Sequence, residues 1–326
     1  MQNNIAQLAE RILGGDRRAL ARAITLIESS RSDHRAEATQ LLEMLAGAGR
    51  EAIRIGLSGT PGVGKSTFVE SFGMMLIERG LRVAVLAVDP SSVRSGGSIL
   101  GDKTRMERLS RAPGAFIRPS PSQLELGGVA RRTRDASALC EAAGYDVVII
   151  ETVGVGQSET QVAQMSDLFL LLLAPAGGDE LQGVKRGIME MADLIVVNKA
   201  DGDLAATARR TMADYAGALS LLRKRENDPE GFPKCMSISA LHENGLAEVW
   251  DEMTALLEWR RAQGHWDRRR AEQRAHWFTQ EVRAGLLAAL TENQGIRDKM
   301  QKFADETAKG QISPTKAAQE MLKLLS

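Results

Sequence analysis

The sequence has few of the residues that mark disulfide-bonded or metal-binding proteins. Its 326 residues include two cysteines, Cys140 and Cys235, which lie far apart and form no CxxC pair, and four scattered histidines. This scarcity argues against a Cys/His metal site and predicts a reduced, cytoplasmic protein. Aromatic residues make up 4% of the chain, whereas Ala, Leu and Arg are frequent, so the composition favours helices with a modest number of strands.

Long hydrophobic runs and a net charge are missing as well. The longest apolar run, residues 168–174, is far shorter than the roughly 20 residues that cross a bilayer, and the first 20 residues carry several charges. We therefore expect no membrane span and no signal peptide. Lys plus Arg total 42 and Asp plus Glu total 42, so no global field attracts nucleic acid or anionic lipid.

What the sequence does contain is a series of short apolar runs, each followed by a turn and a helical stretch. This order is typical of βαβ units and predicts an α/β fold with a mostly parallel, doubly wound sheet. Two or three short helices are expected before it, and a helical extension after it. The expected domains are an N-terminal helical region (1–50), an α/β domain (51–260) and a C-terminal extension (261–326). The expected strands are 53–57, 83–88, 115–118, 147–150, 168–173, 194–197 and 235–238.

A phosphate-binding loop follows the first expected strand. Residues 59–66 match GxxxxGK[ST] at every position. They stand between an expected strand and an expected helix, which is the context that a P-loop NTPase requires. Glycines let backbone N–H groups face phosphate oxygens, Lys65 supplies a cation for the β and γ phosphates, and Ser66 is expected to ligate Mg²⁺. The expected nucleotide contacts here are Gly59, Thr60, Pro61, Gly62, Val63, Gly64, Lys65, Ser66 and Thr67.

Acidic residues follow two other expected strands. Glu151 and Gly154 stand where a Walker B acid and a DxxG-like switch would lie, although a plain acidic strand end is the alternative. Asp89 and Asp102 follow the strand at 83–88 and are candidates to flank Mg²⁺ or to orient a water molecule. The alternative, given equal weight, is that they are isolated aspartates that only keep a loop solvated.

A base-recognition motif follows the strand at 194–197. Asn198, Lys199 and Asp201 match NKxD, in which the carboxylate accepts hydrogen bonds from N1–H and the N2 amine of guanine, a donor pair that adenine lacks. Lys199 is expected to lie over the base, and Ser239, Ala240 and Leu241 to form a third contact loop. The alternative is that Asn198 or Asp201 caps a helix.

Together these segments resemble the MeaB-like GTPases, chaperones associated with methylmalonyl-CoA mutase. The resemblance covers residues from about 50 to 245 and rests on GTPGVGKST at Gly59, AVDPSS at Ala87, GGSILGDKTRM at Gly96, GGVARRT at Gly127, ETVGVGQSE at Glu151, GGDELQGVKRGIME at Gly177, NKAD at Asn198 and SAL at Ser239.

This resemblance implies a GTP-hydrolysing, Mg²⁺-dependent homodimer that docks on an adenosylcobalamin-dependent acyl-CoA mutase, gates cofactor loading and protects the mutase. It assigns Asp89 and Asp102 to a first switch, and Glu151, Gly154 and Gln157 to a second. A third switch at 177–186 would couple to the mutase, unless it is an ordinary charged connection. Its candidate coupling residues are Asp179, Glu180, Gln182, Lys185 and Arg186.

Two departures shape the expected behaviour. Val155 stands where Ras-like GTPases carry a water-orienting glutamine, so we expect slow intrinsic hydrolysis that a partner accelerates. Arginines interleaved with Trp266 and Trp277 suggest a nucleic-acid platform, but acids interrupt them. The resemblance instead implies a dimerisation arm whose tryptophans pack against the partner.

Two other functions remain open on the sequence. Relatives have been described as kinases of periplasmic amino-acid-binding proteins in arginine and ornithine transport, which requires phosphoryl transfer to a protein. No kinase-type HRDxxxxN loop is present to activate such an acceptor. Sister branches are metallochaperones, but this chain has neither a His-rich tract nor a CxxC to carry a metal.

Overall fold

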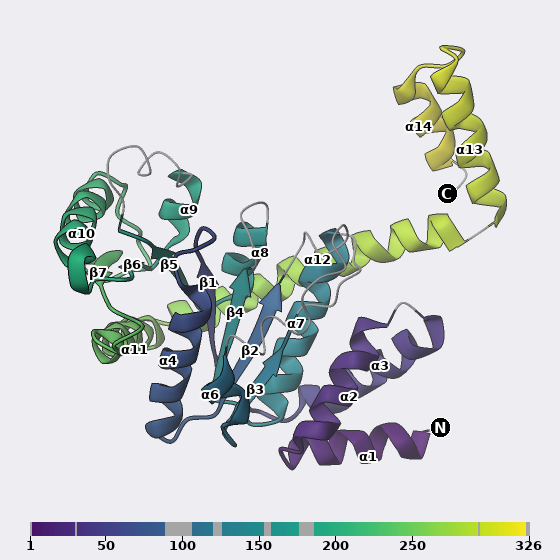
Figure 1. The fold of residues 1–326 in the computed structure, drawn as a ribbon. Helices are drawn as coiled ribbons and strands as arrows, with labels where there is room; N and C mark the ends of the chain where they lie inside the picture. Colours follow the sequence, from purple (N-terminus) through teal and green to yellow (C-terminus); the bar gives the residue numbers. More distant parts are fainter. Residues whose placement is uncertain are drawn as a thin grey trace. The chain divides into compact units, whose positions relative to one another are not determined.

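The computed structural model describes residues 2–29, 31–88, 106–119, 126–152, 158–175, 186–292 and 294–323. Its described strands form a seven-stranded, all-parallel sheet in the order β3-β2-β4-β1-β5-β6-β7 (Figure 1). The predicted α/β fold is confirmed, with β7 shifted by one residue. The strands are β1 Ile53–Ser58, β2 Val83–Val88, β3 Ala115–Arg118, β4 Val147–Thr152, β5 Leu168–Leu173, β6 Leu194–Val197 and β7 Lys234–Ser237.

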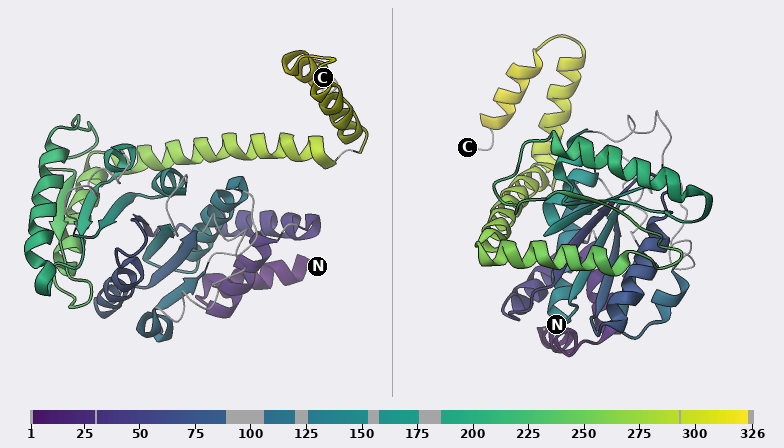
Figure 2. Two further views of the ribbon diagram at one scale, coloured as in Figure 1. Left: turned by 45° about the horizontal axis from the view of Figure 1, so that its top comes forward. Right: turned by 90° about the vertical axis from the view of Figure 1, so that its left-hand side faces the viewer.

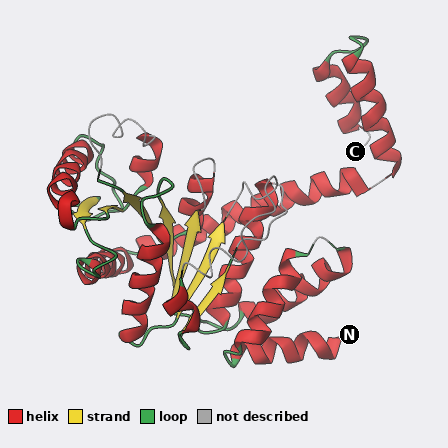
Figure 3. Ribbon diagram, in the orientation of Figure 1, coloured by secondary structure: helices red, strands yellow, loops and turns green. Residues whose placement is uncertain are grey.

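Helices cover both faces of the sheet (Figure 3). Successive residues of a strand point to opposite faces of the sheet, and β1 has helices on both. Ile55 and Leu57 join a core with residues of α4, α6 and α11 on one face, whereas Gly56 faces α8 on the other. Helix α7 packs on β2 and β4, and α10 packs on β6 and β7. The helices are α4 Lys65–Glu78, α6 Glu107–Arg111, α7 Leu126–Ala142, α8 Ser158–Met165, α9 Arg186–Met191, α10 Ala205–Ser220 and α11 Leu246–Ala262.

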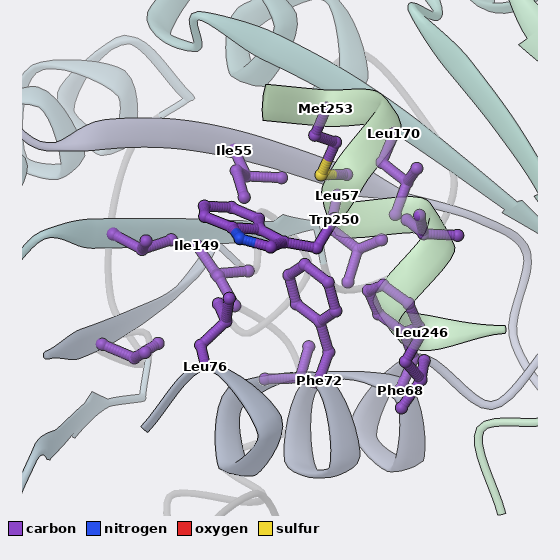
Figure 4. Close-up of a cluster of buried hydrophobic side chains, with 14 of the residues drawn as sticks. Ile55, Leu57, Phe68, Phe72, Leu76, Ile149, Leu170, Leu246, Trp250 and Met253 are labelled. Carbon is purple, nitrogen blue, oxygen red and sulfur yellow. The ribbon is translucent and has the colours of Figure 1, made fainter. Parts of the chain in front are cut away.

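Aromatic packing fixes α4 against the sheet. Phe68 and Phe72 stack with ring centroids 5.0 Å apart, and Phe72 meets the edge of Trp250 from α11 at 6.0 Å (Figure 4). All three side chains are buried beside Ile55 and Leu57. The first turn of α4, which carries the lysine of the predicted phosphate loop, is therefore held rigidly at the end of β1.

Three N-terminal helices pack around α7, in agreement with the sequence. Asp16 caps α2, because its side chain accepts hydrogen bonds from the backbone N–H groups of Arg18 and Ala19 at 2.8 and 3.2 Å. Glu28 at the end of α2 forms an ion pair with Arg118 of β3, which joins this helical layer to the edge strand. The helices are α1 Gln2–Leu13, α2 Arg17–Glu28 and α3 Ser32–Ala46.

The chain divides into two compact units, Met1–Arg269 and Arg270–Ser326. In the second unit α13 (Gln294–Ala308) and α14 (Pro314–Lys323) pack side by side (Figure 2). Helix α12 (His265–Glu292) begins in the first unit and continues into the second. None of the described helices is long and apolar enough to cross a membrane.

Trp266 corrects one expectation about the C-terminal extension. Its side chain is 5% exposed and belongs to the core that α4 and α11 share, where the Arg261 guanidinium lies 4.4 Å from its ring centroid. The chain turns at Gly264, which has a φ of +71°, and α12 then begins with this tryptophan turned inward. The expectation that Trp266 packs against a partner subunit is therefore wrong.

A buried arginine anchors α11 to the β6 end of the sheet. The Arg260 guanidinium donates to Asp193 at 2.6 Å, to Asp228 at 2.5 Å and to the backbone oxygen of Asp167 at 3.0 Å. Burial raises the pKa of Asp193, but Arg260 and Arg225 outweigh this and hold that pKa below its usual range. The two arginines thus favour the ionised form of the Asp193 carboxyl in the interior.

We predict that Arg260→Leu lowers the free energy of unfolding by about 3–5 kcal/mol, because it leaves Asp193 and Asp228 buried without their main cation. Urea denaturation followed by circular dichroism measures this difference. Glu258→Ala, on the exposed side of α11, is the control and is expected to change stability by no more than about 0.5 kcal/mol. Equal stability of the two variants would contradict the proposed anchor.

Candidate functional site

The predicted phosphate loop connects β1 to α4 at the carboxyl edge of the sheet. Gly62 and Gly64 have φ values of +85° and +91°, which side-chain-bearing residues rarely adopt. A Cβ at Gly64 would also lie 2.7 Å from Nδ2 of Asn198, and one at Gly59 would collide with the backbone oxygen of Leu172 in β5. The three glycines are therefore required locally by backbone conformation and by close approach.

Lys65, the first residue of α4, turns back over this loop. Its Nζ donates hydrogen bonds to the backbone oxygens of Gly59 at 2.6 Å and Thr60 at 3.3 Å. Burial holds the pKa of Lys65 below its usual value, and the nearby charges of Glu151 and Glu159 offset part of this effect. Two carboxylates therefore help this half-buried amine to stay protonated, as a phosphate-binding lysine requires.

Two acids lie near this lysine, and the sequence analysis identified only one of them. Glu151 stands near the end of β4 and is 5% exposed. Glu159, in the first turn of α8, is 4% exposed and was missed. It belongs to the ETVGVGQSE segment, but an acid in the first turn of a helix is ordinary and gave no separate signal.

The base-recognition motif lies beside the phosphate loop. The Asn198 side chain donates from Nδ2 to the backbone oxygen of Val63 at 2.9 Å and accepts from the N–H of Ala240 at 2.9 Å. Lys199 has a left-handed φ of +60°, and its Nζ donates to the backbone oxygen of Gly62 at 2.7 Å. A strained non-glycine residue of this kind is characteristic of functional sites.

Asp201 and Ser239 complete this second half of the site. The Ser239 hydroxyl donates to Oδ2 of Asp201 and accepts from the backbone N–H of His242 at 3.2 Å. Asp201 precedes a short 3₁₀ helix, η2 (Gly202–Leu204), but its side chain makes no capping hydrogen bond there. The helix-cap alternative therefore lacks support for Asp201. The Leu241 side chain is exposed.

Several predicted residues cannot be placed. Asp89, Asp102, Gly154, Gln157, Asp179, Glu180, Gln182 and Lys185 lie outside the described residues, as does Val155. Arg186 begins α9, and its side chain is outside the description. The three switches therefore stay predictions.

The placed residues form a site with two ends. Lys65 and the loop glycines lie at one end, and Asp201 with Ser239 lies at the other, joined by Asn198. Ligands of open α/β sheets bind outside the carboxyl ends of the strands, where this site lies. Phosphates at the lysine end and a purine base at the carboxylate end match the chemistry of the two halves.

Comparisons with known proteins identify the family to which the chain is similar. Residues 20–295 match the family described as "Methylmalonyl Co-A mutase-associated GTPase MeaB". A "Putative GTPase" from Caulobacter vibrioides is 51% identical over 319 residues, which cover 98% of this chain and 97% of that protein. "Methylmalonic aciduria type A homolog, mitochondrial" from Mus musculus is 47% identical over 332 residues, which cover 99% of this chain and 80% of that protein.

A solved structure described as "Crystal structure of LAO/AO transport system kinase" is similar along the whole chain. Its TM-score is 0.77 at 37% identity, and the match covers 100% of this chain and 98% of that chain. The chain is thus similar in sequence to proteins described as GTPases, and similar in fold to one described as a kinase.

We predict that Asp201→Asn weakens GDP binding selectively, because an amide cannot accept both guanine hydrogen bonds and leaves a donor unpaired. The expected loss is about 1–3 kcal/mol, or roughly 5–150-fold in Kd. Isothermal titration with GDP and ADP measures it, with Lys65→Ala as the variant expected to bind neither nucleotide. Wild-type GDP affinity in Asp201→Asn would refute the base assignment.

Proposed function

The chain belongs to the MeaB family of P-loop GTPases, and from this premise we propose that it is a GTP-driven chaperone of an adenosylcobalamin-dependent acyl-CoA mutase. In this role it gates cofactor loading and protects the mutase from inactivation. The observation that carries the proposal is the site in which Asn198 joins a phosphate loop to the Asp201–Ser239 pair, within a chain so similar to mutase-associated GTPases.

In this proposal each end of the site has a separate task. Lys65 contacts the β and γ phosphates, and Asp201 reads the guanine base. Mg²⁺ fits the oxygen donors present, since Ser66 is the second residue of α4, beside the loop, and Glu151 is a buried carboxylate near Lys65. Asp89, Asp102 and Gln157 complete the proposed catalytic set. When bound with GTP, Mg²⁺ neutralises charge on the β and γ oxygens.

The family resemblance supports a proposal about the residues that face the partner. Asp179, Glu180, Gln182, Lys185 and Arg186 are proposed to couple nucleotide state to the mutase. Val155 replaces a water-orienting glutamine, so turnover of the free protein is proposed to be slow.

A homodimer is also proposed, on the basis of α12. Phe278, Val282 and Leu286 recur every four residues on this helix, and all three side chains are exposed. An exposed apolar stripe of this length on one helix face is typical of an interface between subunits.

A second candidate is phosphoryl transfer to a protein. The similarity to a structure described as a LAO/AO transport system kinase favours it. The same phosphate loop serves both reactions, so the acceptor of the γ-phosphate distinguishes them.

We expect the purified protein to hydrolyse GTP and not ATP. We also expect a cobalamin-dependent acyl-CoA mutase from the same organism to raise turnover by roughly tenfold or more, which corresponds to lowering the activation free energy by about 1.4 kcal/mol. Phosphate release with and without the mutase measures this. Label from γ-³²P-GTP on a protein acceptor, with no stimulation by a mutase, would favour the kinase.

We expect the double variant Phe278→Asp/Leu286→Asp to be monomeric, because each buried side chain of this size contributes about 1.5–3 kcal/mol to an interface. Sedimentation velocity at several concentrations measures the change. Gln280→Asp, an exposed position on another face of α12, is the matched control and should remain dimeric. A dimeric double variant, or a monomeric wild type, would contradict the proposed interface.

A further inference from the structure

Helix α8 begins at the nucleotide site. It starts at Ser158, directly after the residues assigned to the second switch, and its first turn carries Glu159. This buried carboxylate is close enough to Lys65 for its charge to raise the pKa of that amine. The amino-terminal end of α8 therefore shares its electrostatic environment with the phosphate-binding lysine.

Along its length α8 is pressed against β1. A Cβ at Gly56, in the middle of β1, would lie 2.9 Å from Cγ1 of Val162 and would collide with the Ser166 hydroxyl. The Ser166 hydroxyl itself donates to the backbone oxygen of Val162 at 2.6 Å. The close contact with the strand leaves the helix little room to bend locally, so a displacement at one end is transmitted to the other.

At its other end, α8 is held by an arginine from α12. The Arg269 guanidinium donates from Nε to the backbone oxygen of Ser166 at 3.1 Å and from Nη2 to that of Ala163 at 2.9 Å. Ala163 lies in the last turn of α8 and Ser166 directly follows that helix, where the backbone carbonyls carry partial negative charge. The Ala163 oxygen also accepts from the backbone N–H of Ser166 at 3.4 Å, and the guanidinium adds a cationic donor to this end of the helix.

We propose that Arg269 is a positioning residue for GTP hydrolysis, and that α12 controls turnover through its hold on α8. The guanidinium holds the carboxyl end of a helix whose first turn carries Glu159, the buried acid near Lys65. A partner that shifts the first turns of α12 therefore shifts Glu159 relative to Lys65, without contacting the nucleotide. The inference rests on the proposed function, because it assumes that GTP is hydrolysed at Lys65.

Arg269→Ala is expected to lower single-turnover kcat for GTP by about tenfold, because displacements near 1 Å at a reacting centre cost up to about a hundredfold. The GDP Kd should stay within about twofold, since the phosphate and base contacts remain. Arg269→Lys, which keeps one cationic donor, should recover part of the rate. Arg268→Ala, the exposed neighbour on α12, is the matched control and should behave as wild type.

An unchanged kcat in Arg269→Ala would overturn the inference. A parallel loss of kcat, GDP affinity and melting temperature would also overturn it, because such a loss indicates a purely structural role. A second measurement is independent of turnover. Hydrogen exchange of residues 158–165 should differ between GDP and a non-hydrolysable GTP analogue, and Arg269→Ala should abolish or strongly reduce the difference. If the wild type fails to hydrolyse GTP, the proposed function falls, while hydrogen exchange still decides the role of Arg269.

Discussion

The side chain of Asn198 is the interaction on which the site depends. It is almost fully buried, and it bonds the phosphate loop at Val63 and the loop after β7 at Ala240. A buried amide that makes both bonds stabilises a single arrangement, whereas an amide that lost one would leave a polar group unpaired in the interior. Three loops that are separate in the sequence therefore hold one geometry, and Gly64 must be glycine so that the amide can approach.

The sheet was predictable because its strands are parallel and buried on both faces, which produces continuous apolar runs such as the one in β5. The phosphate loop and NKAD were predictable because their spacing encodes chemistry. Trp266 was misjudged because its arginine-rich surroundings resemble an exposed helix face, while its burial depends on the turn at Gly264. Glu159 was missed because only tertiary structure brings α8 to Lys65. The residues assigned to the switches, including Asp89 and Asp102, still rest on sequence alone.

Several arginines of this chain bind backbone carbonyl groups inside the protein. Arg225 donates to the backbone oxygens of Glu190 and Ala192, Arg260 donates to that of Asp167, and Arg269 holds two carbonyls of α8. A planar guanidinium with several donors suits such groups better than an ammonium does. Two arginines of the segment that resembled a nucleic-acid platform, Arg260 and Arg269, therefore bind backbone carbonyls before β5 and at the end of α8.

The hydrogen bonds of the two site lysines have a consequence for selectivity. Lys65 is bonded to the oxygens of Gly59 and Thr60, and Lys199 to that of Gly62, so the loop backbone competes with any incoming anion for both cations. A lone phosphate or sulfate can meet the backbone N–H groups of the loop, but it reaches nothing at the far end of the site. A whole nucleotide adds contacts to its base at that far end. A ligand long enough to reach both ends therefore competes with the loop carbonyls better than a small anion does.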